Sequence, residues 1–423
     1  MLNFVDQRQA PTNEEMEERP ARCSYPNLRH IRLLDSAAAC GSLSRAANEI
    51  HISQPAATQA ITRLEEQFGV QLLLRGSNGI SLTERGALVV ARFRRALQCL
   101  RKAGQDIQRQ SRVDGGASDI LETHSTIAHL RAIAAFADTG SFAAAGKFLD
   151  QAESSVHRAA RQLERIAGVP LFEERSRHLR LTSVGRLLAV QANLFLAEIV
   201  SAHEELLEYE GSFSGRVRIG TLPLVRNSIV PQLVARVSRQ HPQAVFEISD
   251  GDYDSQIAAL VAGRIDMLVG ALRSTQDVGL IQQELFCDAL SVIARRKHPL
   301  LMREMVTRQD LANYPWVVSR QGTPTRAIFD RLALGAHGIS NTVSPPIIAG
   351  SSDIVRGILL ETDRLTILSP RQIAHEIDSG LLGVVAYDLE NTERRIGMTF
   401  RMGWQPTALQ RIVVETLQEI ARG

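Results

Sequence analysis

The sequence has few of the residues that mark metal, redox or secreted proteins. Four cysteines are scattered through 423 residues, at Cys23, Cys40, Cys99 and Cys287, without a C-x-x-C pair or a neighbouring histidine cluster. This pattern argues against a zinc site and a disulfide framework, and it favours a reducing cytoplasm. We therefore expect no metal and no other cofactor.

Long apolar runs are also missing. No run reaches the roughly 18 residues that a membrane-spanning helix needs, and the N-terminus holds four glutamates within Glu14–Glu18 and no apolar stretch of the signal-peptide type. We expect a cytoplasmic protein without membrane contact, whose residues 1–26 form a flexible tail. The net charge is only +2, so nucleic-acid binding has to be argued from local charge.

Catalytic motifs are absent as well. The chain has no Gly-x-Ser-x-Gly elbow, no phosphate-binding Gly-Lys-Ser/Thr loop, no His-Glu-x-x-His pair and no cysteine with an evident base. No catalytic residue is assigned, and the chain is not expected to be an enzyme. An enzyme built on the C-terminal part is a remote alternative, which turnover of a ligand by the purified protein would revive.

The stretch Gly41–Gly69 predicts two short helices joined by a tight turn. Gly41 suits a left-handed C-cap, Ser42 caps the first helix, and Ser53 caps the second, in whose first turn Pro55 is tolerated. Helical spacing places one side of the second helix in a core: Ala57, Ile61, Leu64 and Phe68. The other side has the neutral and donor-bearing side chains that a DNA major groove requires: Gln54, Ala56, Thr58, Gln59, Thr62 and Arg63.

This helix pair is followed by a basic segment, Arg75–Thr83, with an Asn-Gly turn signal. It predicts the wing of a winged helix-turn-helix, with a long basic helix after it. The whole pattern then occurs again 99 residues later, where Gly41-Ser42 returns as Gly140-Ser141 and Gly86 returns as Gly185. A constant offset throughout the pattern indicates a duplicated domain.

The two copies differ where DNA would be contacted. Ser53-Gln54-Pro55 becomes Ala152-Glu153-Ser154, and losing a serine cap costs about 1 kcal/mol unless Asp150 or Gln151 substitutes for it. Glu153 points a negative charge towards phosphates, whereas His157, Arg158 and Arg161 add donors. The long helix of the second copy is apolar with an acidic outer face, so we expect it to mediate dimerisation.

From Gly211 onward, strands alternate with helices, which predicts a parallel, doubly wound sheet in each of two α/β lobes. In such folds a ligand lies at the carboxyl ends of strands, against helix N-termini. Three segments at such turns form the expected effector site: Thr221, Leu222 and Pro223; Ser319, Gly322 and Thr323; Ser351 and Ser352. A helix cap is the alternative role for each hydroxyl.

Together these motifs resemble those of LysR-type transcriptional regulators. The DNA-binding resemblance covers residues 27–85 and 127–184, and the effector-domain resemblance covers residues 211–415. It depends on Ser53-Gln54-Pro55-Ala56, Leu64-Glu65 and Leu82-Thr83, and on Val217-Arg218-Ile219-Gly220, His241-Pro242 and His298-Pro299-Leu300. Ser352–Gly357 and Trp404-Gln405-Pro406-Thr407 resemble the subgroup of galactose-binding-protein regulators, which implies a sugar or an organic acid as effector.

The resemblance implies a multidomain fold: two all-α winged helix-turn-helix domains followed by a two-lobed α/β effector domain like a periplasmic binding protein. The expected ranges are a tail at 1–26, the first unit with its long helix at 27–110, a linker at 111–126, the second unit with its dimerisation helix at 127–210, and the effector domain at 211–423. The implied DNA-contacting residues are Ser53, Gln54, Pro55, Ala56, Thr58, Gln59, Arg63, Arg75, Ser154, Ser155, His157, Arg158, Arg161, Arg175 and Arg177.

The implied partners are double-stranded promoter DNA, a small organic effector, further copies of the chain in a homodimer or homotetramer, and RNA polymerase. Ordinary members of the family have one helix-turn-helix unit, so the additional copy is the departure. Either both copies contact DNA, or one of them serves only for contact with protein.

Overall fold

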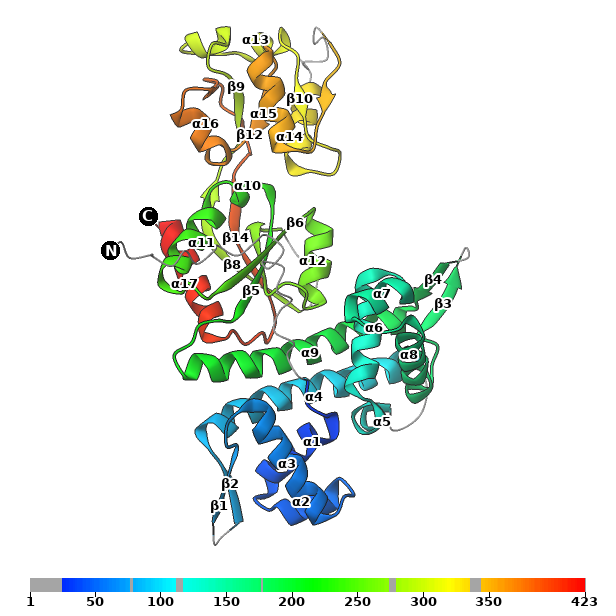
Figure 1. The fold of residues 1–423 in the computed structure, drawn as a ribbon. Coiled ribbons are helices and arrows are strands. Elements are labelled where there is room, and N and C mark those ends of the chain that lie inside the picture. Colours follow the sequence, from blue (N-terminus) through cyan, green and yellow to red (C-terminus); the bar gives the residue numbers. More distant parts are fainter. Residues whose placement is uncertain are drawn as a thin grey trace, which may run out of the picture. The chain divides into compact units, whose positions relative to one another are not determined.

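The computed structural model describes residues 25–76, 79–111, 117–175, 178–273, 279–334 and 344–422. The expected tail lies almost wholly outside these residues, as does Arg177. The chain divides into two compact units, 1–210 and 211–423 (Figure 1).

The first unit consists of one series of elements that occurs twice (Figure 1). The first series is α1 (Leu28–Cys40), α2 (Leu43–Glu49), α3 (Gln54–Phe68), β1 (Leu73–Gly76), β2 (Gly79–Leu82) and α4 (Glu84–Ser111). The second is α6 (Ile127–Thr139), α7 (Phe142–Leu149), α8 (Glu153–Ala167), β3 (Phe172–Arg175), β4 (His178–Leu181) and α9 (Ser183–Tyr209). The hairpins β1–β2 and β3–β4 are antiparallel, so the expectation of all-α domains was wrong.

Glycine ends the helix before each helix pair as expected, but serine caps the second helix only in the first pair. Gly41 and Gly140 have φ of 65° and 77° and end α1 and α6 in the left-handed conformation. Ser53 Oγ accepts a hydrogen bond from the N–H of Ala56 at 3.4 Å. Ala152 starts α8 in a similar extended conformation but provides no side-chain cap. The preceding Asp150 has a φ of 55° and ends α7 instead of capping α8.

A carboxylate holds the entrance to each wing. Glu65 Oε1 accepts hydrogen bonds from the N–H groups of Leu72 and Leu73, at 2.8 and 3.2 Å. Glu164 repeats this arrangement in the second copy, with its own pair of N–H donors at 2.8 and 3.1 Å. The glutamates of the two Leu-Glu pairs therefore join the ends of α3 and α8 to their hairpins.

Threonine and glycine complete the other side of the wing. Thr83 Oγ1 caps α4 by accepting from the N–H of Gly86 at 2.8 Å, and Thr182 does the same for Gly185 at 3.0 Å. A Cβ atom on Gly86 would overlap the carbonyl oxygen of Leu72. The repeated Leu-Thr pairs and glycines thus allow the long helix to start against the hairpin.

The segment expected to be a linker contains a helix, α5 (Ala117–His124). Leu121 is buried, and Arg101 Nε on α4 donates to Glu122 Oε2 at 2.7 Å. A two-turn helix is marginal by itself and gains its stability from such packing. The local glycines and acids could not reveal a helix that depends on contacts with α4.

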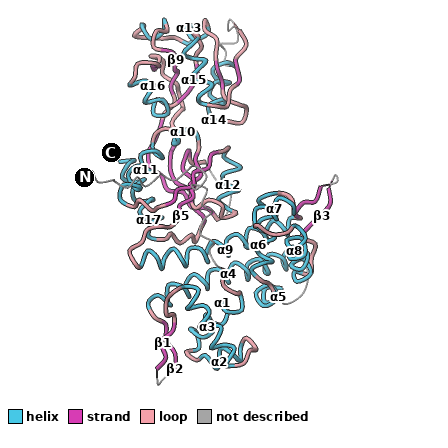
Figure 2. Tube along the Cα trace, in the orientation of Figure 1, coloured by secondary structure: helices cyan, strands magenta, loops and turns pink. Residues whose placement is uncertain are grey.

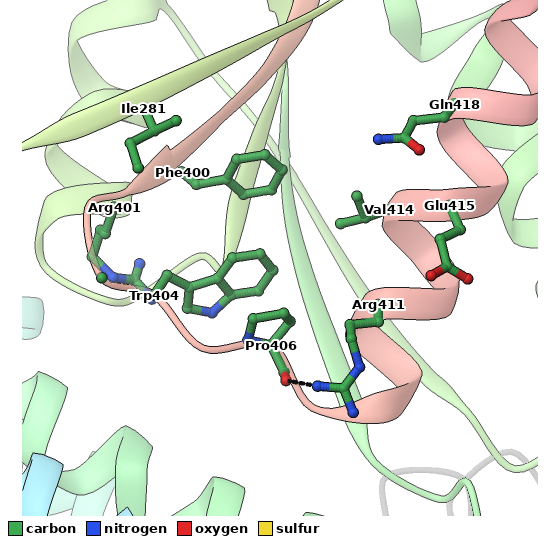
Figure 3. A pocket seen from close by; sticks show the side chains of 10 residues that line it. Ile281, Phe400, Arg401, Trp404, Pro406, Arg411, Val414, Glu415 and Gln418 are labelled. Atoms are coloured by element: carbon green, nitrogen blue, oxygen red, sulfur yellow. Dashed lines mark hydrogen bonds between the residues drawn. The ribbon is translucent and has the colours of Figure 1, made fainter.

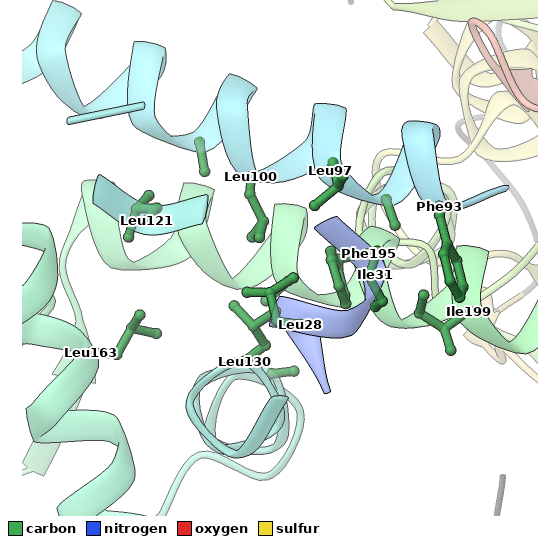
Figure 4. Packing of buried hydrophobic residues seen from close by; sticks show 14 of the residues in the cluster. Leu28, Ile31, Phe93, Leu97, Leu100, Leu121, Leu130, Leu163, Phe195 and Ile199 are labelled. Carbon is green, nitrogen blue, oxygen red and sulfur yellow. The ribbon is translucent and has the colours of Figure 1, made fainter. Parts of the chain in front are cut away.

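The two long helices, α4 and α9, pack side by side within one hydrophobic core that includes residues of both copies (Figure 4). Phe93, Leu97 and Leu100 of α4 and Phe195 and Ile199 of α9 are completely or almost completely buried. Among the described residues, α9 is the one helix whose length and composition would allow it to cross a membrane. That evidence is weak, because a core helix of this kind passes the same test.

The first lobe of the second unit is built on a five-stranded sheet in the order β6-β5-β7-β14-β8. Its strands are β5 (Arg216–Thr221), β6 (Val245–Asp250), β7 (Met267–Ala271), β8 (Leu280–Asp288) and β14 (Arg394–Arg401), and its helices are α10 (Pro223–Arg226), α11 (Ile229–Gln240), α12 (Tyr253–Val261) and α17 (Ala408–Arg422). The strands β5, β6 and β7 are parallel, as expected, but β14 is antiparallel to both of its neighbours. The expected parallel sheet is therefore mixed.

The second lobe contains a small antiparallel sheet, β12-β9-β13, and a parallel pair, β10–β11 (Figure 2). The strands are β9 (Ser291–Arg295), β10 (Val317–Val318), β11 (Ile347–Ile348), β12 (Thr366–Leu368) and β13 (Leu382–Val384). The helices are η1 (Pro299–Met302), α13 (Arg308–Ala312), α14 (Pro324–Leu334), α15 (Ser352–Glu361), η3 (Pro370–Ile373) and α16 (Ala374–Asp378).

A buried carboxylate lies where the chain passes from one lobe to the other. Asp288, at the end of β8, accepts hydrogen bonds from Ser369 Oγ at 2.7 Å and from Arg394 Nε at 3.0 Å. Asp288 and Ser369 are 6% and 0% exposed. Strand β8 leads into the second lobe and β14 returns from it, so this cluster ties both crossings together.

Candidate nucleic-acid interface and effector site

Helix α3 exposes the face that the sequence assigned to DNA. Its buried side consists of Ala57, Ala60, Ile61, Leu64 and Phe68. The predicted DNA-contacting residues on or before this helix are exposed, except for the half-buried Thr58: Ser53, Gln54, Pro55, Ala56, Gln59 and Arg63. An exposed run of amide, hydroxyl and guanidinium donors is suited to both base edges and phosphates.

Positive charge gathers at the side of α3 that faces α1. Burial and the guanidinium groups of Arg63 and Arg29 lower the pKa of His30. The imidazole is therefore neutral near pH 7, and the local positive charge comes from the two arginines. This favours an anionic partner at that surface.

Helix α8 exposes a similar but less uniform face. Ser154, His157 and Arg158 are exposed and Ser155 is half-buried, while Glu153 is exposed in the first turn. The His157 ring packs edge-on against Phe142, with centroids 4.8 Å apart. Arg158 is an exposed cation of this face at the position that corresponds to Gln59 of α3, while Gln162 stands where α3 has Arg63.

The Arg161 side chain is 37% exposed and contacts residues near the wing. Its Nη1 lies 2.7 Å from Glu164 Oε2, and its guanidinium lies over the Phe172 ring at 5.1 Å. Burial opposes the charge of Glu164, but Arg161 and the N–H groups at the wing entrance outweigh it and lower the pKa of this carboxyl. Arg161 therefore supports the wing entrance, and its contact with DNA stays a prediction.

The wings have basic residues at their ends. Arg75 is exposed on β1 opposite Ile80. On the second wing, Arg175 pairs through its backbone with His178, and Arg180 is exposed on β4. The contact of Arg75 and Arg175 with DNA stays a prediction.

The first predicted effector segment is mostly internal. Thr221 is 0% exposed and its Oγ1 donates to the carbonyl of Ser249 at 3.1 Å, while Leu222 is 6% exposed against Gly270. Pro223 is exposed at the start of α10, which contacts η3 of the second lobe. Thr221 therefore holds strand β6, and the segment reaches the boundary between the lobes through α10.

The other two segments differ in how their hydroxyls are used. Thr323 Oγ1 accepts from the N–H of Arg326 at 3.2 Å, so this residue caps α14. Ser351 precedes α15 without a side-chain cap, and it is exposed, as is Gly322. Ser319 and Ser352 are half-buried. Thr323 thus has the structural role that the sequence left as an alternative.

A separate pocket of about 370 Å³ lies in the first lobe between β8, β14 and α17 (Figure 3). The Phe400 and Trp404 rings are stacked in it with centroids 5.0 Å apart, and Arg401, Arg411 and Glu415 also line it. None of the eight predicted effector residues lines this pocket. Trp404 was noted in the sequence only as part of a subgroup motif, because the aromatic stack depends on the return of β14 beside β8.

Comparison with known proteins decides the family. Residues 210–422 match the LysR substrate binding domain, and residues 28–87 and 127–186 each match the helix-turn-helix of bacterial regulatory proteins of the lysR family. The chain belongs to the LysR family of transcriptional regulators. This LysR-family protein therefore combines DNA-binding helix-turn-helix structure with an effector-binding domain, which confirms the resemblance drawn from the sequence.

Curated relatives are HTH-type transcriptional regulators. The LysR-family chain is 30% identical over 388 residues to the HTH-type transcriptional regulator GalR of Pseudomonas putida, covering 89% of this chain and 93% of the relative. It is 23% identical to the regulator PcaQ of Agrobacterium fabrum, covering 69% and 94%. The GalR alignment omits too little of this chain to leave out either helix-turn-helix segment.

Solved structures show the same fold. Full-length OxyR from Pseudomonas aeruginosa superposes with a TM-score of 0.53 at 19% identity, covering 71% of this chain and 95% of OxyR. ArgP from Mycobacterium tuberculosis superposes with a TM-score of 0.52 at 17% identity, covering 70% and 97%.

Proposed function

We propose that this LysR-family regulator binds promoter DNA through both of its helix-turn-helix units and responds to a small organic molecule, a sugar or an organic acid, bound between the lobes of residues 211–423. It acts in the cytoplasm as a homo-oligomer, without catalysing a reaction, and RNA polymerase is a further partner. The observation that carries the proposal is the repeated exposure of one polar, donor-bearing face, on α3 and again on α8.

The effector part of the proposal is supported by the boundary between the lobes. Helix α10 follows the buried Thr221 and contacts η3, and the Asp288 cluster joins the two crossing strands. A ligand that binds one arrangement of the lobes more tightly than another would shift their equilibrium. We expect this shift to change how the helix-turn-helix units bind DNA.

The test compares two single substitutions in the full chain. Arg63→Ala removes the exposed arginine of α3 and Arg158→Ala removes an exposed arginine of α8, and each should weaken binding to the upstream DNA by about 1–3 kcal/mol. Affinity is measured by fluorescence anisotropy, with Arg109→Ala, at the far end of α4, as the control. If only one substitution weakens binding, the other copy does not contact DNA.

The second candidate keeps the regulator but uses the second copy for contact with protein. The uncapped start of α8 and the exposed Glu153 favour it, because a carboxylate at that place repels phosphates. It predicts that Arg158→Ala leaves DNA affinity unchanged while Arg63→Ala lowers it.

A further inference from the structure

The pairing of α4 with α9 brings the two copies together within one chain. Arg85 contacts Glu210 at 3.3 Å, Arg92 contacts Glu205 at 2.5 Å, and Arg95 contacts Glu198 at 3.0 Å. Positions that increase along α4 meet positions that decrease along α9. The helices are therefore antiparallel, in a register that holds over several turns (Figures 1 and 4).

The charges at this contact are divided between the helices, with the cations on α4 and the carboxylates on α9. Arg92 is only 4% exposed and also contacts Glu198, at 2.9 Å. The side chains of Glu198 and Glu205 are 15% and 18% exposed. A buried charge needs a partner, because removing one member of such a pair leaves the other uncompensated.

The 99-residue offset shows which residues would face each other in an α4–α4 or an α9–α9 pair. Arg92 of α4 corresponds to Gln191 of α9, and Arg95 corresponds to Leu194. In an α9–α9 pair of the same register, Glu198 and Glu205 would therefore face an amide and a leucine instead of two guanidinium groups. The carboxylates would lose their cations.

An α4–α4 pair would also match its charges less well than the α4–α9 pair. Glu198 corresponds to Cys99 of α4, and Glu205 corresponds to Asp106. In an α4–α4 pair, Arg92 and Arg95 would meet one carboxylate and a thiol in place of two carboxylates. Only the mixed pair gives an opposite charge to both arginines and both glutamates, which is how charged helix pairs select their partners.

The connection between the copies favours pairing within one chain. Ser111, the last residue of α4, is separated by five residues from Ala117, the first residue of α5, a span of at most about 20 Å. Helix α5 is tied back to α4 by the contact of Arg101 with Glu122 and also contacts α8. The second copy is thus held beside the α4 of its own chain.

We propose that α4 and α9 of one chain form a charge-selected helix pair, so that a single chain presents two helix-turn-helix units as an internal pseudo-dimer. The expected dimerisation helix α9 then has its partner within the chain, and copies of the chain associate through other surfaces. This pairing rests on the proposed function for its meaning: each molecule would then bring two DNA-binding units.

The test joins the two helices covalently in the full chain. Arg95→Lys places an amine beside the Glu198 carboxylate, and a zero-length carbodiimide can link the two as an amide. We expect a peptide joining positions 95 and 198, found by mass spectrometry in the band with the mass of one chain. The same joined peptide in a band of twice that mass would overturn the proposal, because α4 would then pair with another copy.

Arg94→Lys is the matched control. Arg94 lies next to Arg95 but contacts Asp35, at 2.7 Å, whose side chain is 20% exposed against 15% for Glu198. If the control links to position 35 while Arg95→Lys gives no link to Glu198, the α4–α9 pair does not form. DNA binding is not needed for either readout, so loss of DNA affinity with an intact link would refute the proposed function alone.

Charge reversal tests whether the ions select the pair. Arg92→Glu, added to Arg95→Lys, places a third carboxylate beside Glu198 and Glu205 and should lower the yield of the link several-fold. Glu205→Arg in the same chain should recover it. An unchanged yield in the Arg92→Glu chain would show that charge does not select this pair.

Discussion

At the scale of single residues, the start of α4 depends on an absent Cβ atom. Gly86→Ala should strongly destabilise the first helix-turn-helix unit, because the new methyl group would overlap the backbone of Leu72. Gly357→Ala in α15 is the matched control: its Cβ meets no atom within 4 Å, so this change should be neutral or stabilise by up to about 1 kcal/mol. Urea denaturation of the two variants checks the contrast, and equal losses would contradict it.

A second residue-scale prediction concerns His203, whose ring stacks on Phe68 at a centroid distance of 4.0 Å. Burial lowers the pKa of His203 in the folded chain, against a weaker opposite effect of the Ile199 carbonyl. The unfolded chain therefore binds more protons below the ordinary histidine pKa of about 6.5, and stability should fall as the pH is lowered through that value.

The check is to measure the urea midpoint from pH 7.5 to pH 5 in His203→Phe, which keeps the stacked ring but does not titrate. Its loss of stability at low pH should be smaller than that of the parent chain. The exposed His124→Phe serves as the control. A parallel decline in all three proteins would show that His203 does not contribute.

Single residues also show the limit of prediction from sequence. The serine cap of α3 and the glycine ends of α1 and α6 follow from backbone rules, and the structure shows them. The contacts of Arg161 with Glu164 and the Phe172 ring could not be predicted, because they depend on the tertiary fold. Thr221 was read as a ligand residue because its burial depends on the parallel pairing of β5 with β6.

At the scale of elements, α3 has a serine cap that can be removed, and α8 lacks a cap that can be added. Ser53→Ala should cost about 1 kcal/mol of stability, and Ala152→Ser should add a similar amount, because both residues have the extended conformation of an N-cap. Chemical denaturation of the two variants measures both changes. Destabilisation by Ala152→Ser would mean that the start of α8 cannot place a hydroxyl over its first turn.

The α4–α9 pair makes the other element-scale prediction. Arg92→Met removes a buried cation and leaves Glu198 and Glu205 without it, so unfolding free energy should fall by about 3–5 kcal/mol. Arg109→Met, at a position 78% exposed, should change stability little. Similar values for both variants would show that the buried pair does not stabilise this core.

Elements were predicted well where their pattern is local and poorly where a partner forms them. The helix-turn-helix bounds and the parallel strands β5, β6 and β7 follow from spacing and strand–helix alternation. Helix α5 and the antiparallel strand β14 could not be predicted in this way. Helix α5 depends on packing against α4, and β14 depends on the return of the chain between β7 and β8. The hydrophobic pattern of a single segment does not show which strands it will lie between.

At the scale of the whole molecule, we expect a regulator with two DNA-binding units in each chain. The alignment with GalR covers 89% of this chain and 93% of that relative. The duplication could be predicted from the 99-residue offset. The pairing of α4 with α9 could not, because the apolar pattern of α9 favoured a helix that mediates dimerisation.

Footprinting on the DNA upstream of the gene, with the full chain, Arg63→Ala and Arg158→Ala, tests most directly whether both copies bind DNA. Each variant should lose protection over a different part of the site and keep the remainder. If Arg158→Ala protects the same bases as the unaltered chain with unchanged affinity, the second copy does not bind DNA, and binding through two units is wrong.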